Sequence, residues 1–222
     1  MEAIKKFFLQ MKEGRNKFGL RIFLCVFGVI NMGFSISWLD PIKFGTDPCT
    51  VMNLGISDKI GLPFGTTLLI YNCILFIAVL LWGRHQIGIG TLANMVLVGY
   101  SKDFFNWIWA KFIPETFYDP FKTRAIILIP ALIWFIVAAA LYMAVDLGTS
   151  PYDAVPNIIA KKLPKISFTI VRIAWDVVMT LVGFMLGSTI GVVTVAVALF
   201  LGPAIVWVKN LLVKLFGLKK VE

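Results

Sequence analysis

The sequence is poor in charged residues. Only 15% of its 222 residues are Asp, Glu, Lys or Arg, whereas 59% are hydrophobic. Soluble domains are typically about 25% charged and about 45–50% apolar. With a mean hydropathy of +0.87, the chain has too little polar surface to cover a globule of this size in water. This composition excludes an ordinary soluble enzyme, a disordered chain and a nucleic-acid-binding module.

The sequence also lacks the residue patterns of catalytic and metal sites. It has one histidine, His85, and its three cysteines, Cys25, Cys49 and Cys73, show no CxxC spacing. These counts exclude a disulfide framework and a histidine-rich metal site. HExxH, GxSxG and Walker sequences do not occur in it. The sequence therefore predicts no enzymatic activity, no metal and no cofactor.

Long apolar segments dominate the chain instead. A helix needs about 20 apolar residues to cross a hydrocarbon core of roughly 30 Å. Six segments meet or approach this length, at residues 20–38, 64–82, 87–109, 124–145, 166–186 and 190–208. The third is the weakest because Lys102 and Asp103 interrupt it. We predict an all-α polytopic membrane protein with six transmembrane helices.

Positive charges are distributed unequally between the two sides of the predicted membrane. With the N-terminus in the cytoplasm, 14 of the 21 lysines and arginines fall on the cytoplasmic side and 6 on the outer side. Cytoplasmic segments of membrane proteins are enriched in these residues. We predict a multi-pass protein of the plasma membrane with both termini in the cytoplasm. The net charge of +9 then reflects this asymmetry and attraction to anionic lipid, so the expected partner is the bilayer rather than nucleic acid.

An internal repeat relates residues 21–99 to residues 124–202 at an offset of 103. Glycine, proline, threonine and arginine recur at matching positions: Arg21 and Arg124, Gly45 and Gly148, Thr46 and Thr149, Pro48 and Pro151, Gly88 and Gly191, Thr91 and Thr194, Gly99 and Gly202. Each copy holds three spans, and an odd number turns the second copy upside down relative to the first. The sequence therefore predicts two inverted repeats, as in many secondary transporters.

This repeat divides the chain into five predicted segments. They are an interfacial amphipathic segment or a frayed basic tail at 1–18, membrane repeat 1 at 19–109, an aromatic linker at 110–123, membrane repeat 2 at 124–208 and a basic cytoplasmic tail at 209–222.

A GT-x-P sequence follows the first span of each repeat. It comprises Gly45, Thr46, Asp47 and Pro48 in one copy and Gly148, Thr149, Ser150 and Pro151 in the other. Asp or Ser before Pro is typical of a helix start, since the side chain accepts a hydrogen bond from an amide and proline has no amide to satisfy. We predict short helices at 48–58 and 151–162. They are either half-helices that enter the core, where they face an anionic group or form a gate, or capped helices at the lipid interface.

Several polar residues lie within the predicted spans. Arg172 and Asp176 are four residues apart, so they share a helical face and are expected to pair. A charge in a span is costly, by at least about 2.5–3.5 kcal/mol. The pair is therefore either a substrate or proton-coupling site or a structural ion pair. Asn72 and Asn94 are further candidates for the substrate or ion pathway, and Asp103 is a secondary candidate for it.

These motifs resemble the YczE/YyaS/YitT family of prokaryotic integral membrane proteins. The resemblance rests on FGTDP and LGTSP after the first span of each half, on IGIGT at 87–91, on Gly99, and on Arg172 and Asp176 ahead of residues 187–194. The resemblance implies a bacterial or archaeal plasma-membrane protein of a family with unassigned biochemistry, for which movement of small solutes is the expected role.

Inverted repeats give a protein two related conformations, one open to each side of the membrane. The sequence therefore predicts a permease for a small polar or ionic metabolite, with alternating access between the two GT-x-P gates. The alternative is a membrane-embedded substrate-binding subunit, or a sensor of unknown ligand, that acts with a partner complex. The sequence makes no prediction of the oligomeric state.

Overall fold

The computed structural model describes residues 17–218. The predicted amphipathic segment at 1–18 lies almost entirely outside this range. The described α-helices are α2 (Phe18–Leu39), α3 (Pro48–Ile60), α4 (Phe64–Trp82), α5 (Ile89–Phe112), α6 (Phe121–Ala144), α7 (Pro151–Lys162), α8 (Phe168–Met185) and α9 (Val192–Phe216). Two short 3-10 helices, η1 (Arg84–Gln86) and η2 (Glu115–Tyr118), join them. No strand occurs between residues 17 and 218, so this part is all-α as predicted.

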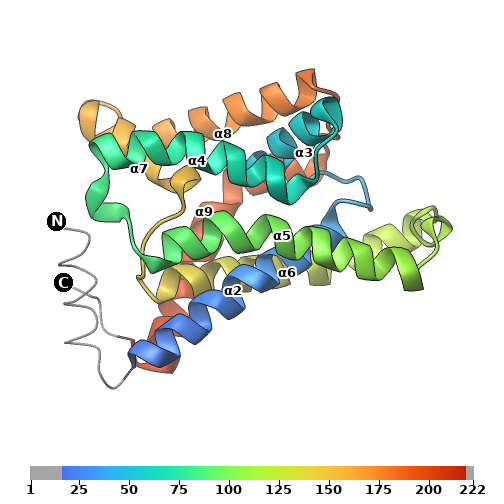
Figure 1. Ribbon diagram of the computed structural model, residues 1–222, viewed down its shortest axis with the longest axis horizontal. Coiled ribbons are helices and arrows are strands. Elements are labelled where there is room, and N and C mark those ends of the chain that lie inside the picture. The colour runs from blue at the N-terminus through green and yellow to red at the C-terminus, as the bar shows by residue number, and fades with distance from the viewer. Residues whose placement is uncertain (1–16, 219–222) are drawn as a thin grey trace.

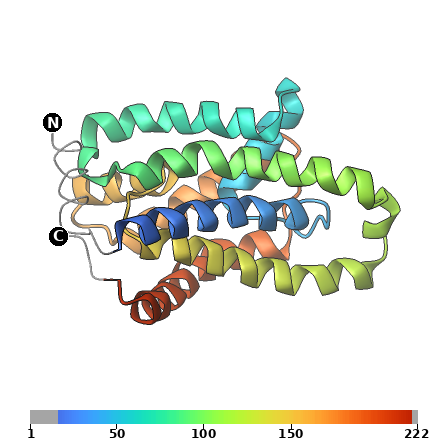
Figure 2. The same ribbon diagram turned by 60° about the horizontal axis from the view of Figure 1, so that its bottom comes forward.

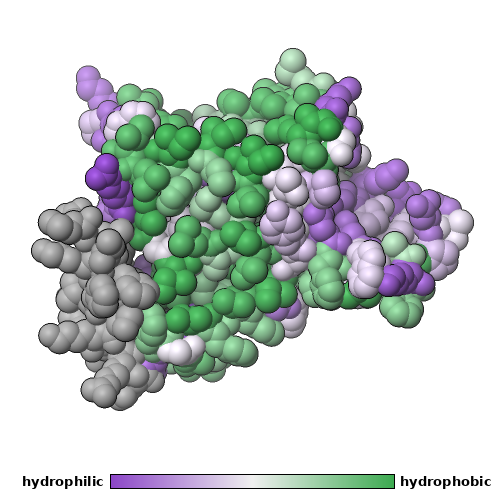
Figure 3. Space-filling model, in the orientation of Figure 1, coloured by the Kyte–Doolittle hydropathy of each residue, from purple (hydrophilic) through white to green (hydrophobic). Residues whose placement is uncertain are grey.

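Five helices, α2, α4, α6, α8 and α9, are long and apolar enough to cross a membrane. In two views α2, α4, α5 and α6 run roughly along the same direction (Figures 1 and 2). Hydrophobic residues form a broad band across the middle of the molecule, and hydrophilic residues gather toward its ends (Figure 3). A band of apolar surface between polar ends is typical of a protein surrounded by lipid. The fold is that of a multi-pass helical membrane protein.

α5 is the predicted span that hydropathy does not place among those five. With 24 residues it is long enough to cross the bilayer, but Lys102 and Asp103 lower its hydropathy. Both charges have partners: Lys102 Nζ lies 2.8 Å from Asp40 Oδ2, and Asp103 Oδ2 accepts a 2.7 Å hydrogen bond from the Gly65 amide. The structure thus has five long apolar helices that could cross a membrane and one more charged long helix packed against α2 and α4.

The last helix is longer than the sequence predicts. α9 continues to Phe216, so much of the segment predicted as a tail at 209–222 is helical. Apolar residues continue through Leu211 and Leu212, which extends the hydrophobic pattern past position 208. The helix ends at Gly217, whose φ of +57° forms the left-handed cap that glycine favours.

The short helices α3 and α7 begin at the predicted GT-x-P sequences. Asp47 Oδ1 accepts a 3.1 Å hydrogen bond from the Thr50 amide, and Ser150 Oγ accepts a 3.2 Å bond from the Asp153 amide. The first residue of each helix is a buried proline, whereas the last turn of each contains exposed lysine. Both helices therefore start in the interior of the protein. They lie toward opposite ends of the molecule, α3 on the right and α7 on the left (Figures 1 and 2).

α2 and α6, the first helices of the two halves, pack closely in the core. A Cβ at Gly28 would lie 2.9 Å from Ala138 O and 3.1 Å from Tyr142 N, so only glycine allows this approach of the two backbones. At the end of the contact, Arg21 Nη1 donates a 2.7 Å hydrogen bond to Val145 O. This central pair positions the two loops that follow it.

Candidate functional site

Each GT-x-P loop packs against the start of a helix in the other half of the chain. Gly45 has a φ of +90°, and a Cβ there would lie 2.7 Å from Gly191 N. Gly148 has a φ of +117°, and a Cβ there would lie 2.6 Å from Gly88 N. A side chain would meet both a strained backbone and a clash at these positions. The two contacts join positions that are related by the same offset of 103.

Backbone hydrogen bonds follow the same relation. Phe44 O accepts from Val193 N at 3.2 Å, and Leu147 O, 103 residues later, accepts from Gly90 N at 2.8 Å. Each loop therefore binds the first turn of a long helix from the opposite half. The glycines that recur in the sequence meet one another in the structure, which their spacing alone does not reveal.

The two loop threonines are in different environments. Thr149 O accepts a 2.9 Å hydrogen bond from Thr91 Oγ1. Thr46 is only 2% exposed, and its Oγ1 has no hydrogen-bond partner within residues 17–218. The two loops match in the hydrogen bonds of Phe44 O and Leu147 O, whereas the Oγ1 of Thr194, 103 residues after Thr91, has no hydrogen-bond partner within residues 17–218.

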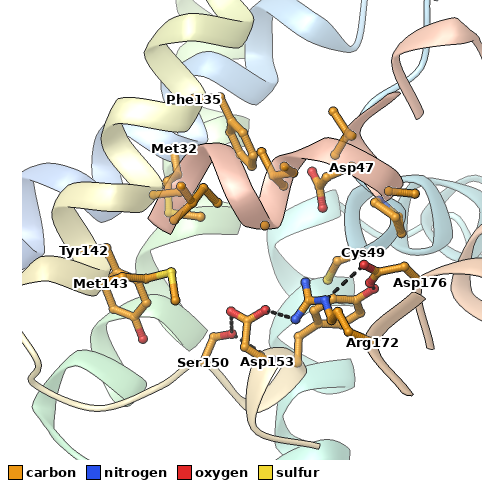
Figure 4. A pocket seen from close by; sticks show the side chains of 18 of the residues that line it. Met32, Asp47, Cys49, Phe135, Tyr142, Met143, Ser150, Asp153, Arg172 and Asp176 are labelled. Carbon is orange, nitrogen blue, oxygen red and sulfur yellow. Dashed lines mark hydrogen bonds and ion pairs between the residues drawn. The ribbon is translucent and has the colours of Figure 1, made fainter. Parts of the chain in front are cut away.

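A cavity of about 880 Å³ extends to the starts of both α3 and α7 (Figure 4). All eight described α-helices contribute residues to its wall, which is mostly apolar and includes Met32, Phe135 and Met143. Its charged lining residues are Asp47, Asp153, Arg172 and Asp176. Small-molecule sites are typically about 300–1,000 Å³, with apolar walls and a few polar groups. The cavity has the size and lining of such a site.

Arg172 joins two carboxylates in this cavity. Its Nε donates a 3.0 Å hydrogen bond to Asp176 Oδ2, and its Nη1 forms an ion pair with Asp153 Oδ1. The Tyr152 hydroxyl donates to the other oxygen of Asp176 at 2.6 Å, and the guanidinium lies 5.2 Å from the centre of the Tyr152 ring. The predicted pairing of Arg172 with Asp176 is confirmed. Two residues at the start of α7, Tyr152 and Asp153, also contact this pair.

Asp153 is not among the candidate site residues that the sequence predicts. One of its carboxylate oxygens, Oδ2, accepts a 2.6 Å hydrogen bond from Oγ of the capping residue Ser150. The other carboxylate oxygen contacts Arg172, which lies on the next helix of the chain. The sequence signal for a role of Asp153 at the site is its position in the first turn of a helix that starts in the interior. The spacing of 19 residues between these partners carries no periodicity that predicts a contact.

The other predicted polar residues divide into two groups. Asn72 and Asn94 line the cavity. Asn72 is 2% exposed, and its Oδ1 has no hydrogen-bond partner in the described part of the chain. Asp103 does not line the cavity, since its carboxylate binds the Gly65 amide where α4 meets α5. The geometry therefore places Asp103 in a helix–helix contact rather than beside the cavity.

The helix starts at the cavity have few amides left for an anionic ligand. The Thr50 and Asp153 amides donate to the capping side chains of Asp47 and Ser150. The first residue of each helix is proline and has no amide hydrogen. An anion at a helix start normally binds such amides. This geometry disfavours the anion-binding role that we considered for the half-helices.

The second and third long helices are arranged differently in the two halves. α4 and α5 pack closely, and a Cβ at Gly99 would lie 2.6 Å from Gly65 Cα. The residues 103 positions later, Phe168 of α8 and Gly202 of α9, line the cavity and are exposed. A Cβ at Gly202 would have no neighbour within 4 Å. The cavity therefore reaches the surface of the protein between α8 and α9.

The fold and the buried charges define a multi-pass helical membrane protein with an internal ligand-sized cavity. Residues 19–210 match the family of unknown function DUF6198, and the chain belongs to this family. It is 24% identical over 198 residues to an uncharacterized protein of Haemophilus influenzae, covering 88% of this chain and 85% of that protein. No solved structure matches the chain. These matches do not name the YczE/YyaS/YitT proteins, so that finer resemblance stays a prediction.

Proposed function

We propose that the protein is a permease of the plasma membrane for a small polar or ionic metabolite. In this proposal α5 is the sixth span, beside the five apolar ones, and the two halves are inverted three-helix repeats. The GT-x-P loops are the two gates, and the protein opens alternately to each side of the membrane. Both termini lie in the cytoplasm.

The reciprocal contact of the two loops carries this proposal. Gly45 touches Gly191 as Gly148 touches Gly88, and the loops lie toward opposite ends of the molecule (Figure 1). A twofold relation between halves, with its axis in the membrane plane, accounts for matching contacts at opposite ends. A single fold that contains two equivalent gates around one cavity has the parts that alternating access requires.

The cavity residues supply the binding function. Arg172 and Asp176 bind the substrate or its coupling ion, and Asn72 and Asn94 orient it. Buried charges and amides in membrane spans are costly, and they commonly belong to substrate or ion pathways. The charged side chains of Arg172 and Asp176 line the cavity and do not lie in a helix–helix contact away from it, which supports this assignment.

The unequal helix pairs support a state in which one gate is closed. The Gly65–Gly99 contact closes α4 against α5, whereas Phe168 and Gly202 lie on the walls of an open cavity. In the opposite state the repeats exchange these arrangements. α8 then closes against α9, and α4 separates from α5.

A reversible crosslink tests this exchange. Phe168→Cys and Gly202→Cys are introduced together into a protein without Cys25, Cys49 and Cys73. Because a disulfide needs Cα atoms within about 7 Å, it forms only when α8 closes on α9. Purified protein in liposomes is screened for substrate-induced currents with amino acids, organic acids, nucleosides and amines. We expect at least one class to give a current that oxidation abolishes and reduction restores.

The matched control pairs Phe168→Cys with Phe200→Cys. Phe200 is exposed on α9 and does not line the cavity, so no disulfide is expected. Absence of a disulfide in the first pair would contradict the exchange of conformations. Absence of current with every class, together with co-purification of an ATPase, would favour the binding-subunit alternative.

A further inference from the structure

The charges that line the cavity do not balance. Three carboxylates, those of Asp47, Asp153 and Asp176, face one guanidinium, that of Arg172. With every group ionised, the lining carries an excess of two negative charges. Charges buried in an apolar wall are costly unless an opposite charge accompanies them. This excess of negative charge therefore points to a positive charge that the protein itself does not supply.

One of these two charges belongs to Asp47, and the other remains on the two carboxylates that share Arg172. Asp153 and Asp176 both contact Arg172, whereas the hydrogen bond described for the Asp47 side chain comes from the uncharged Thr50 amide. Asp47 lies on the same cavity as Arg172 and Asp176 (Figure 4). A ligand cation beside Asp47 gains a charge partner without displacing the existing ion pairs.

Two observations define the chemistry of this cation. The unpartnered Oδ1 of buried Asn72 is an acceptor on the cavity wall, so it favours a ligand that donates hydrogen bonds. Within residues 17–218 there is no group of three His, Cys, Asp or Glu side chains able to hold a metal ion. The mostly apolar wall, with Met32, Phe135 and Met143, suits a hydrocarbon body rather than a hydrated ion.

We infer that the site takes an organic ammonium ion, a small molecule with a protonated primary amine and an apolar body. Its ammonium group binds Asp47, and its body occupies the apolar part of the cavity. That this ammonium ion is a transported substrate rests on the proposed function. Binding of the ion to the site does not depend on transport.

Three probes that share a phenylethyl group and differ in charge test the inference. They are 2-phenylethylamine, 2-phenylethanol and 3-phenylpropanoate, titrated by calorimetry into the full-length protein in detergent at pH 7. We expect the amine to bind and the alcohol and carboxylate to bind at least about tenfold more weakly. Equal binding of amine and alcohol, or preference for the carboxylate, would overturn the inference.

The variant Asp47→Asn removes the charge and keeps a residue that caps helices well. We expect its affinity for 2-phenylethylamine to fall about tenfold, since a close, partly buried charge pair is lost. The control Asp58→Asn makes the same charge change at an exposed residue of α3 and leaves the affinity unchanged. Equal losses in both variants would contradict the role of Asp47.

The binding and current measurements together also distinguish this inference from the proposed permease. Charge-selective binding without current in liposomes would retain the ligand class and reject transport. Current with an anionic or neutral class, without amine binding, would retain the permease and reject the ammonium ligand. If Asp47→Asn does not fold, the three probes on the native protein still decide the outcome.

Discussion

Gly148 meets two separate requirements at a single residue. Its φ of +117° is a conformation that residues with a side chain rarely adopt, and a Cβ there would lie 2.6 Å from Gly88 N. Gly187 has a φ of +94° with nothing within 4 Å of its Cβ position. Comparing the two separates the cost of the backbone conformation from the cost of the loop contact.

At this scale we predict the effect of Gly148→Ala on stability. It should lower the free energy of unfolding by about 2–4 kcal/mol, because backbone strain and a clash with the backbone add. Gly187→Ala should cost about 1–2 kcal/mol, from strain alone. Thermal unfolding in detergent, followed by tryptophan fluorescence, measures both. Equal losses would show that the loop adapts and that the close contact is not required.

At the scale of helices, two pairs with matching sequence positions pack differently. α4 and α5 touch at Gly65 and Gly99, and the Asp103 carboxylate binds the Gly65 amide at that contact. α8 and α9 contact each other little, and Gly202 faces open space. A sequence repeat therefore does not enforce equal packing, because helix pairs respond to the side chains and loops around them.

This difference predicts opposite effects of one substitution at two matching positions. Gly99→Ala should destabilise the protein by about 1–3 kcal/mol, since its methyl group forces α4 away from α5. Gly202→Ala should be neutral or stabilising by up to about 1 kcal/mol, because alanine favours a helix and no neighbour is displaced. Thermal unfolding of the two variants in the same detergent gives the comparison. A loss at Gly202 as large as at Gly99 would be inconsistent with an open α8–α9 gap.

At the scale of the molecule, two short helices start near one cavity and end toward opposite ends of the protein (Figures 1 and 2). Their last turns contain exposed residues, and the apolar band lies between them (Figure 3). The proposed inverted repeat predicts that the end of α3 and the end of α7 lie in different compartments when the protein is in a membrane.

Labelling single cysteines tests this orientation. Lys59→Cys at the end of α3 and Lys165→Cys after α7 are made separately in a cysteine-free protein, and both positions are exposed. A membrane-impermeant maleimide should label Lys59→Cys in intact cells, and Lys165→Cys only after permeabilisation. Labelling of both positions, or of neither, in intact cells would reject opposite placement of the two helices.

Much of the fold follows from local sequence patterns. The long helices appear where apolar residues extend over about 20 positions, since burying a backbone in lipid requires internal hydrogen bonds. The starts of α3 and α7 follow from capping residue and proline, whose effects act within one turn. The Arg172–Asp176 pair follows from helical spacing. The extension of α9 past residue 208 shows that the sequence predicts the ends of helices less well than their presence.

The amino-acid sequence by itself determined the class of the protein, the positions of its helices and the residues that recur between its halves, because hydropathy, capping and helical spacing act over short stretches of chain. Only the tertiary structure decided that each loop binds the opposite half, that Asp153 and Tyr152 join Arg172 and Asp176, and that Asp103 instead joins two helices. These contacts depend on how helices distant in sequence approach one another, and that approach is set by close packing over the whole molecule.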